Sequence, residues 1–384
     1  MNILIAPNAF KDALTATEAS DAIATGLLAS ALACRCERFP VADGGDGTGE
    51  LLIERLGGER RRAFVRDPLG RRIEASFGLV GRTAVVEMAA ASGLRLLRPN
   101  ERDPLRASSF GAGQLIKAAL GAGAKQVVLG VGGSATVDGG AGLLVALGAD
   151  FLDASGAPLA DLPQDLARLE VIDLAGVPPE LMGGALIVLC DVESPILGPG
   201  GATAVYGPQK GASPAAVKTL EAGLTRFCDV IRRQTGQDVA QLPRGGAAGG
   251  VAAGLAGLLG AELVRGIDYF LDETGFDAAL ERADLVVTGE GRIDAQTLQG
   301  KAPMGVAVRA RAQGVPVVAL AGQIGDAADV ARAFDLVLSI ADPPRPLAEA
   351  LAHAKVDLTA AAKSLGDQLA DGALPALSRR RSSG

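Results

Sequence analysis

The sequence predicts an α/β protein made of two α/β domains. Short runs of β-branched and apolar residues alternate with amphipathic stretches of helical length, a pattern typical of helices packed around largely parallel sheets. With 384 residues, the chain is long for a single hydrophobic core. The alternation of strands and helices is regular at both chain ends, whereas the middle of the chain contains a hairpin-like segment and glycine-rich stretches. We therefore expect one domain formed by residues 1–60 together with 282–384, and a second domain inserted over residues 61–281.

The N-terminal end predicts two strand–helix units. A strand over Ile3–Ala6 leads to a helix over Thr15–Ala29, and Thr15 and Glu18 have the spacing of a capping box. A second strand ends near Val41 and opens into the loop ADGGDGTGE, which a further helix follows. In each unit a polar loop separates the strand from the helix.

The rest of the chain predicts further strands of two kinds. Near the C-terminus, apolar runs predict strands over Asp284–Thr288, Val315–Ala321 and Phe334–Ser339. The segment RDPLGRRIEASFGLVGRTAVVEM, residues 66–88, is hairpin-like, and Ile187–Cys190 is predicted to be a buried strand. The inserted part therefore mixes hairpin strands with strand–helix units.

The composition disfavours several classes of protein. A net charge of −7 argues against a nucleic-acid or anionic-membrane partner, because both need a concentrated basic surface, and the dense basic run is confined to Arg379–Arg381. The most apolar segment, residues 245–261, is mostly glycine and alanine and is too short to span a bilayer. The N-terminal residues lack the basic region of a secretion signal. We expect a cytoplasmic protein with small-molecule partners and assign no oligomeric state.

Histidine and cysteine chemistry is disfavoured as well. His353 is the only histidine in the sequence, which argues against a Ser-His-Asp triad and against a multi-histidine zinc site. The four cysteines lack the spacing of zinc ligands, and we expect buried, reduced thiols.

Polar and charged residues gather directly after the predicted strands. In open parallel sheets, ligands bind where loops leave the carboxyl ends of the strands. Helix capping would account for a single Asp or Ser in such a loop, but not for lysines and paired carboxylates. The residues concerned are Asn8, Lys11, Asp43, Asp191, Gly289, Glu290, Arg292, Asp294 and Lys301.

A glycine-rich run, VGGSATVDGGAG, occupies residues 131–142. Residues 130–135 match the dinucleotide pattern G-x-G-x-x-A, and Asp150 lies about twenty residues further on, so a nicotinamide-dependent dehydrogenase is an alternative. Further glycines interrupt the helix that this fingerprint requires. The Walker A pattern also fails, because Lys301 lacks the Ser or Thr that should follow it.

These residues together favour phosphoryl transfer. Consecutive backbone N–H groups and a hydroxyl before a helix bind a polyanion without either fingerprint. Carboxylate oxygens are the ligands that Mg²⁺ prefers, and lysines neutralise phosphoryl charge. The candidates are Gly132, Gly133, Ser134 and Thr136 for phosphate, Asp138, Glu290 and Asp294 for magnesium, and Lys11, Lys210 and Lys301 for the phosphoryl charge.

Long stretches of the chain resemble the bacterial type-1 glycerate kinase family. The resemblance is close, nearly full length, and carried by separate segments in the same order. These segments are IAPNAFKDALTATEAS, VADGGDGTGE, RDPLGRRI, EMAAASGLRLL, GVGGSATVDGGAGLLVALGADFLD, CDVESPILGPGGATAVYGPQKGA, GAAGGVAAGL and ADLVVTGEGRIDAQTLQGKAPMGVA.

The resemblance implies that the domain split across the chain ends is flavodoxin-like. It also implies ATP- and Mg²⁺-dependent phosphorylation of D-glycerate, usually at the 2-hydroxyl, and leaves phosphorylation at the 3-hydroxyl open. The chain departs from the family pattern at Val137, usually Asn, at Asn8-Ala9, usually Asp-Ser, and at Glu193-Ser194, commonly Asp-Asn.

Transfer to a secondary alcohol needs a proton acceptor, positive charge around the γ-phosphate and donors for the substrate carboxylate. We expect Asp191 to be the base, because the buried strand before it would hold it rigidly, with Asp43 and Asp294 as rival bases or magnesium ligands. The glycine-rich run could hold either phosphate or glycerate. The remaining assignments are Lys11 in catalysis, Lys210, Gly289 and Lys301 at the nucleotide, and Asn8, Arg66 and Arg292 at the substrate, whose carboxylate an arginine can clamp.

Overall fold

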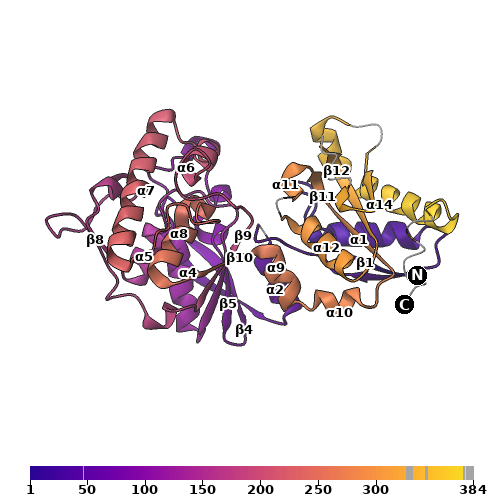
Figure 1. Ribbon diagram of the computed structural model, residues 1–384, viewed down its shortest axis with the longest axis horizontal. Coiled ribbons are helices and arrows are strands. Elements are labelled where there is room, and N and C mark those ends of the chain that lie inside the picture. Colours follow the sequence, from indigo (N-terminus) through magenta and orange to yellow (C-terminus); the bar gives the residue numbers. More distant parts are fainter. Residues whose placement is uncertain (46, 299, 326–331, 342–344, 375–376, 378–384) are drawn as a thin grey trace. The chain divides into compact units, whose positions relative to one another are not determined.

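The computed structural model describes residues 1–45, 47–298, 300–325, 332–341, 345–374 and 377, and it divides the chain into two compact units (Figure 1). The first unit comprises Met1–Asp43 and Ile267–Gly384, and the second comprises Gly44–Gly266. Relative to the expected domains, residues 44–60 go with the inserted unit and residues 267–281 with the split one. The basic run Arg379–Arg381 lies outside the described residues.

The packing of the flanking helices explains where the two units meet along the chain. Helix α2 (Thr48–Arg55) lies against strands β4 (Arg72–Val80) and β5 (Thr83–Glu87) of the inserted unit. On the other side of the boundary, the Phe276 ring stands edge-on against Phe39 of the first unit, with ring centroids 5.2 Å apart.

The first unit is built on a parallel sheet in the order β13-β12-β11-β1-β2. Numbered within the unit, this is the 2-1-3-4-5 order of flavodoxin-like folds, as the resemblance implies. Buried residues of β1 and β11 pack with α1 and α14 on one face of this sheet. The elements are β1 (Asn2–Ile5), α1 (Ala16–Leu28), β2 (Arg35–Arg38), α9 (Gly266–Glu273), α10 (Phe276–Leu280), β11 (Leu285–Ile293), α11 (Ala295–Leu298), α12 (Ala302–Ala312), β12 (Val317–Ile324), β13 (Leu336–Ser339) and α14 (Leu347–Ala370).

Helix α1 begins as the sequence predicts. Thr15 is its N-cap, and its hydroxyl oxygen accepts a hydrogen bond from the Glu18 N–H at 3.2 Å. The Glu18 carboxylate accepts one from the Thr15 N–H at 2.9 Å, so the capping box is complete.

Strand β11 runs further than predicted. It continues to Ile293, and Glu290 and Arg292 pair with Ala321 and Gln323 of β12. The prediction that Gly289, Glu290 and Arg292 lie in a loop is therefore wrong. The backbones are close here, because a Cβ atom on Gly289 would collide with the carbonyl of Leu320.

The second unit contains a mixed sheet in the order β10-β9-β6-β5-β4-β3. Strands β3 to β5 are antiparallel, which confirms the predicted hairpins, and β5, β6, β9 and β10 are parallel. The remaining elements are β3 (Glu59–Arg66), α3 (Ala89–Ser92), α4 (Phe110–Gly121), β6 (Gln126–Gly130), α5 (Ala141–Leu147), β7 (Asp150–Leu152), β8 (Val171–Asp173), β9 (Leu186–Cys190), α6 (Ala202–Tyr206), α7 (Pro214–Thr235), α8 (Ala247–Leu259), β10 (Glu262–Arg265) and short 3₁₀ turns at Leu94–Leu96, Pro99–Glu101, Gln164–Arg168, Pro179–Leu181 and Pro208–Lys210.

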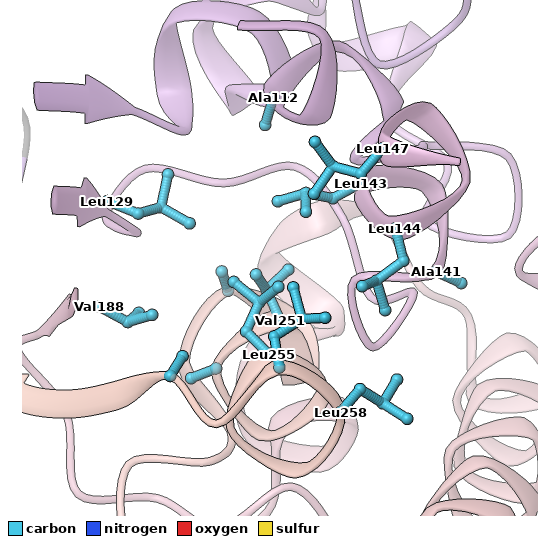
Figure 2. Close-up of a cluster of buried hydrophobic side chains, with 14 of the residues drawn as sticks. Ala112, Leu129, Ala141, Leu143, Leu144, Leu147, Val188, Val251, Leu255 and Leu258 are labelled. Atoms are coloured by element: carbon cyan, nitrogen blue, oxygen red, sulfur yellow. The ribbon is translucent and has the colours of Figure 1, made fainter. Parts of the chain in front are cut away.

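The core of the second unit lies between its parallel strands and helices α5 and α8. Figure 2 shows Leu144 of α5 and Val251 and Leu255 of α8 with Leu129 of β6 and Val188 of β9, all fully buried. These contacts hold both ends of the glycine-rich segment, which leaves β6 and enters α5.

The described helices include none with the length and apolar character needed to cross a membrane.

Replacing Thr15 with Ala should destabilise the protein, because the mutation removes one half of the capping box. We expect a loss of about 1 kcal/mol in the free energy of unfolding, measured by urea denaturation. The control is Thr25→Ala on the same helix, where the hydroxyl bonds only to the Asp21 carbonyl one turn earlier. Equal effects of the two substitutions would contradict a capping role for Thr15.

Candidate functional site

The carboxyl ends of β1 and β11 form the first candidate site. The two strands are neighbours. The connection from β1 leads to β2 at one edge of the sheet, and the connection from β11 leads to β12 in the other direction, so right-handed crossovers place α1 and α12 on opposite faces. This is the topological switch point at which flavodoxin-like folds bind ligands. The Asn8 N–H donates to the Gly289 carbonyl at 2.8 Å, so the β1 loop continues along β11.

Glu290 is the most perturbed carboxyl group of this site. Glu290 is only 6% exposed, and this burial raises the pKa of its carboxyl group to about 7. The Thr297 hydroxyl donates to Oε1 at 2.6 Å and Lys301 is a nearby positive charge, and both oppose the rise in pKa. The negative charges of Asp43 and Asp294 add to it. Glu290 can therefore exchange a proton near neutral pH.

Asn8 and Asp43 bind each other in this site. The Asn8 amide donates from Nδ2 to Asp43 Oδ2 at 3.1 Å, while its Oδ1 accepts from the Ala9 N–H at 2.8 Å. Both polar ends of Asn8 are thus engaged, so this side chain holds Asp43 in position.

The basic residues predicted for this unit differ in their surroundings. Lys11 is exposed in the turn between Phe10 and Leu14. Arg292 donates from Nε to Asp294 Oδ2 at 2.8 Å, with the arginine side chain 62% exposed. Lys301 is half-buried at the N-terminus of α12 and lies close enough to Glu290 to affect its charge. Arg292 therefore pairs with the Asp294 carboxylate, and Lys301 acts electrostatically on Glu290.

The second candidate site lies at the carboxyl ends of the parallel strands in the inserted unit. Strand register places Gly130 at the end of β6 opposite both Glu87 of β5 and Leu189 of β9. The glycine-rich run begins directly after Gly130. Asp191 directly follows β9 and is exposed. The strands therefore bring Asp191 and the glycine-rich run to the same edge of this sheet.

The tip of the glycine-rich run presents backbone donors. Gly133 is exposed and has a φ of 67°, a left-handed conformation that favours glycine. Within the described part of the chain, the N–H groups of Gly133 and Ser134 make no hydrogen bond, while the Gly133 carbonyl accepts from the Leu94 N–H at 2.8 Å. Successive N–H groups around such a residue form a concave anion site.

Lys210 lies beneath this tip. It is 4% exposed and donates from Nζ to Ser134 Oγ at 2.9 Å and to the Thr136 carbonyl at 2.8 Å. Burial lowers the pKa of Lys210 to about 8, and the negative charge of Asp138 acts in the opposite direction. The expectation that Lys210 and Thr136 contact phosphate directly needs correction, because both side chains are buried. Lys210 instead supports the loop and places positive charge beneath its tip.

Asp138 is buried and accepts backbone hydrogen bonds at the starts of helices α4 and α5, although we expected a magnesium ligand. It is 1% exposed, and its Oδ2 accepts from the N–H and the hydroxyl of Ser109 at 2.8 and 2.7 Å. Its Oδ1 accepts from the Gly140 N–H at 3.0 Å. Helix α5 begins only at Ala141, so Gly133 and Ser134 do not lie at a helix N-terminus, contrary to our expectation. The dinucleotide fingerprint fails for the same reason.

Arg66 ends strand β3, and its guanidinium carbon lies 5.7 Å from the centre of the Phe110 ring. Its side chain is exposed. No contact in the described structure joins Arg66 to the glycine-rich run.

Two residues of these sites are not among those expected from the sequence. Thr297 bonds to Glu290, and its spacing from Asp294 is that of a capping pair, which is a readable signal. Glu87 ends a strand that we predicted only as part of a hairpin, so its place beside the glycine-rich run was overlooked.

Comparison with known proteins agrees with this architecture. The profile described as Glycerate kinase family matches residues 3–370. A Bacillus subtilis protein named glycerate kinase is 43% identical over 92% of this chain and 94% of its own length. The Escherichia coli glycerate 2-kinase is 41% identical over 97% of this chain and 99% of its own.

A solved structure is similar as well. A crystal structure of a protein from Salmonella typhimurium LT2, described as a glycerate kinase 2, has a TM-score of 0.83 and 42% sequence identity. The match covers 97% of this chain and 99% of the other. The chain therefore belongs to the glycerate kinase family and is a kinase.

Proposed function

We propose that this protein transfers the γ-phosphoryl group of ATP to the 2-hydroxyl of D-glycerate, giving 2-phospho-D-glycerate and ADP. The observation that carries the proposal lies at the glycine-rich run, where two N–H groups at its tip make no hydrogen bond within the described residues and the Lys210 ammonium lies below them. The relative from Escherichia coli is named a 2-kinase, which favours the 2-hydroxyl over the 3-hydroxyl.

The carboxylates of the first unit fit a magnesium ion that accompanies ATP. One or two of Asp43, Glu290 and Asp294 would supply oxygen ligands, and the negative charges of Asp43 and Asp294 add to the rise that burial causes in the pKa of Glu290. The described residues contain no group of three His, Cys, Asp or Glu placed to hold a metal ion unaided. Mg²⁺ commonly binds through one or two carboxylates together with substrate phosphates. When bound, it would neutralise charge on the β- and γ-phosphates.

The side chains of the protein then have separate tasks. The glycerate hydroxyl oxygen forms a bond to the γ-phosphorus, the bond to the β–γ bridging oxygen breaks, and ADP leaves with that oxygen. Asp191 accepts the hydroxyl proton, since it is exposed directly after a buried strand. Lys11 and Lys301 offset phosphoryl charge, and Gly289 lets the nucleotide approach the backbone of β11.

The oxyanions need their own donors. The N–H groups of Gly132, Gly133 and Ser134 are proposed to hold an oxyanion, either a phosphate of ATP or the glycerate carboxylate. The Gly132 N–H contributes least, because it already donates to the Gly44 carbonyl at 3.3 Å. Arg66 and Arg292 stay as candidate partners of the substrate carboxylate, with Asn8 acting through Asp43.

The reaction itself is the first test. With Mg²⁺ and ATP present, D-glycerate should be consumed with equimolar ADP formation, and NMR of the product should show phosphate on the 2-hydroxyl. Absence of turnover would contradict the kinase assignment to this substrate. A product carrying phosphate on the 3-hydroxyl would contradict only the position.

Replacing Asp191 with Asn should lower kcat by about 100-fold or more, because the amide cannot accept the substrate proton. The control is Asp229→Asn, which makes the same change at an exposed ion pair on α7. Steady-state kinetics of both variants would measure the effect. Near-normal kcat for Asp191→Asn would show that another group is the base, and Asp43 would be the next to test.

The positive charge of Lys210 should make the reaction sensitive to alkaline pH. The ammonium is charged at neutral pH and loses its proton as the pH rises through about 8, so kcat/KM should fall over that range. Lys210→Met should lower kcat/KM at pH 7 and lose this alkaline decline, whereas Lys218→Met, at an exposed position of α7, should behave as the wild type. An unchanged pH profile in Lys210→Met would refute the role of this charge.

A further inference from the structure

Glu87 supplies the cap that helix α2 lacks within its own segment. The N-cap of α2 is Gly47, which has no side chain to bond with the first N–H groups of the helix. The Glu87 Oε1 atom accepts from the Gly47 N–H at 2.9 Å and from the Gly49 N–H at 3.0 Å. A carboxylate from strand β5 thus binds the start of a helix that lies 38 residues earlier.

The fit between this carboxylate and the helix is close. A Cβ atom on Gly49 would lie 2.8 Å from Glu87 Cγ, which is nearer than real Cβ contacts come. Glycine at position 49 therefore allows Glu87 to reach both N–H groups. Asp46 lies outside the described residues.

The capped segment also contacts the glycine-rich run. Thr48 Oγ1 donates to the Gly45 carbonyl at 2.7 Å and accepts from the Gly44 N–H at 3.0 Å, which closes the turn. The Gly44 carbonyl in turn accepts from the Gly132 N–H. A Cβ atom on Gly132 would lie 2.7 Å from the Gly45 Cα atom, so the two backbones touch.

Glu87 is connected to the glycine-rich run by its backbone as well as by its side chain. Glu87 pairs with Gly130, two residues before Gly132. Its backbone therefore fixes the end of β6, while its side chain fixes the turn that bonds to Gly132. The end of β6 and the turn before α2 thus both contact the same residue.

We propose that Glu87 is a positioning residue of the kinase site, which orients residues 47–49 and, through the bonds of Thr48 to Gly44 and Gly45, the N–H groups of the glycine-rich run. The inference rests on the proposed function of that run. Glu87 acts through hydrogen bonds to Gly47 and Gly49, and it neither touches the substrate nor transfers a proton.

The experiment compares Glu87→Ala with Glu87→Gln in the full-length protein. The amide oxygen of Gln accepts the same two N–H groups, so Glu87→Gln should keep kcat/KM close to wild type, whereas Glu87→Ala should lower it by about tenfold or more. The effect should lie mainly in KM for the substrate whose oxyanion the run holds. The matched control is the pair Glu74→Ala and Glu74→Gln. The Glu74 side chain is 48% exposed on β4, and it forms an ion pair with Arg62 of the neighbouring strand β3.

Hydrogen exchange separates this inference from the proposed function. In Glu87→Ala, amides in peptides covering residues 44–52 should exchange faster, while peptides from α1 stay as in the wild type, whether or not glycerate is the substrate. Unchanged exchange in 44–52 would overturn the capping contact. Equal losses of kcat/KM in Glu87→Ala and Glu87→Gln would overturn positioning and indicate a need for the negative charge itself. Wild-type kcat/KM in Glu87→Ala would overturn any role in the site.

Discussion

The pairing of β1 with β11 is the constraint on which the first unit depends. Ile3, Leu4 and Ile5 are hydrogen-bonded in parallel to residues 285–287, which lie at the opposite end of the chain. Side chains reinforce this pairing, since Asp284 accepts from the Asn2 N–H at 2.7 Å and the Thr288 hydroxyl donates to the Ala6 carbonyl at 2.7 Å. This strand pair places Asn8 beside β11, and Asn8 in turn holds Asp43 near Glu290.

Buried charge organises both units, but with different chemistry. In the first unit, Glu290 is buried near the negative charges of Asp43 and Asp294. Burial and these charges raise the pKa of its carboxyl group toward 7. In the second, Lys210 is buried with two oxygen acceptors, and its ammonium supports a loop whose outer face is polar backbone. A buried charge is costly unless hydrogen bonds compensate it, so such residues are retained where they do something that a neutral side chain cannot.

Local patterns in the sequence predicted what depends on neighbouring residues. The capping box at Thr15, the hairpins over 66–88 and the alternation of strands and helices all rest on short-range spacing, and the structure has each of them. The crowding of Asn8, Asp43 and Glu290 was predictable because parallel strands bring their carboxyl ends to one edge.

What the sequence could not predict depends on burial and on distant partners. Lys210 and Ser134 are 76 residues apart, and nothing local distinguishes a lysine beneath a loop from one that meets phosphate. Asp138 has the residue type and setting of a metal ligand, yet its role is decided by Ser109, 29 residues earlier. Polar groups in a glycine-rich loop can bond to the protein or to a ligand, and only the fold determines which.

The split of the first unit has a consequence for synthesis on the ribosome. The central strand β1 is made first, but its partner β11 emerges only after the whole inserted unit, roughly 15–60 s later at typical elongation rates. The inserted unit, with its sheet and core complete within Gly44–Gly266, can fold during that interval. The N-terminal residues must meanwhile keep an apolar strand unpaired on one side, which makes this segment the one that chaperones have most reason to bind while the chain is being made.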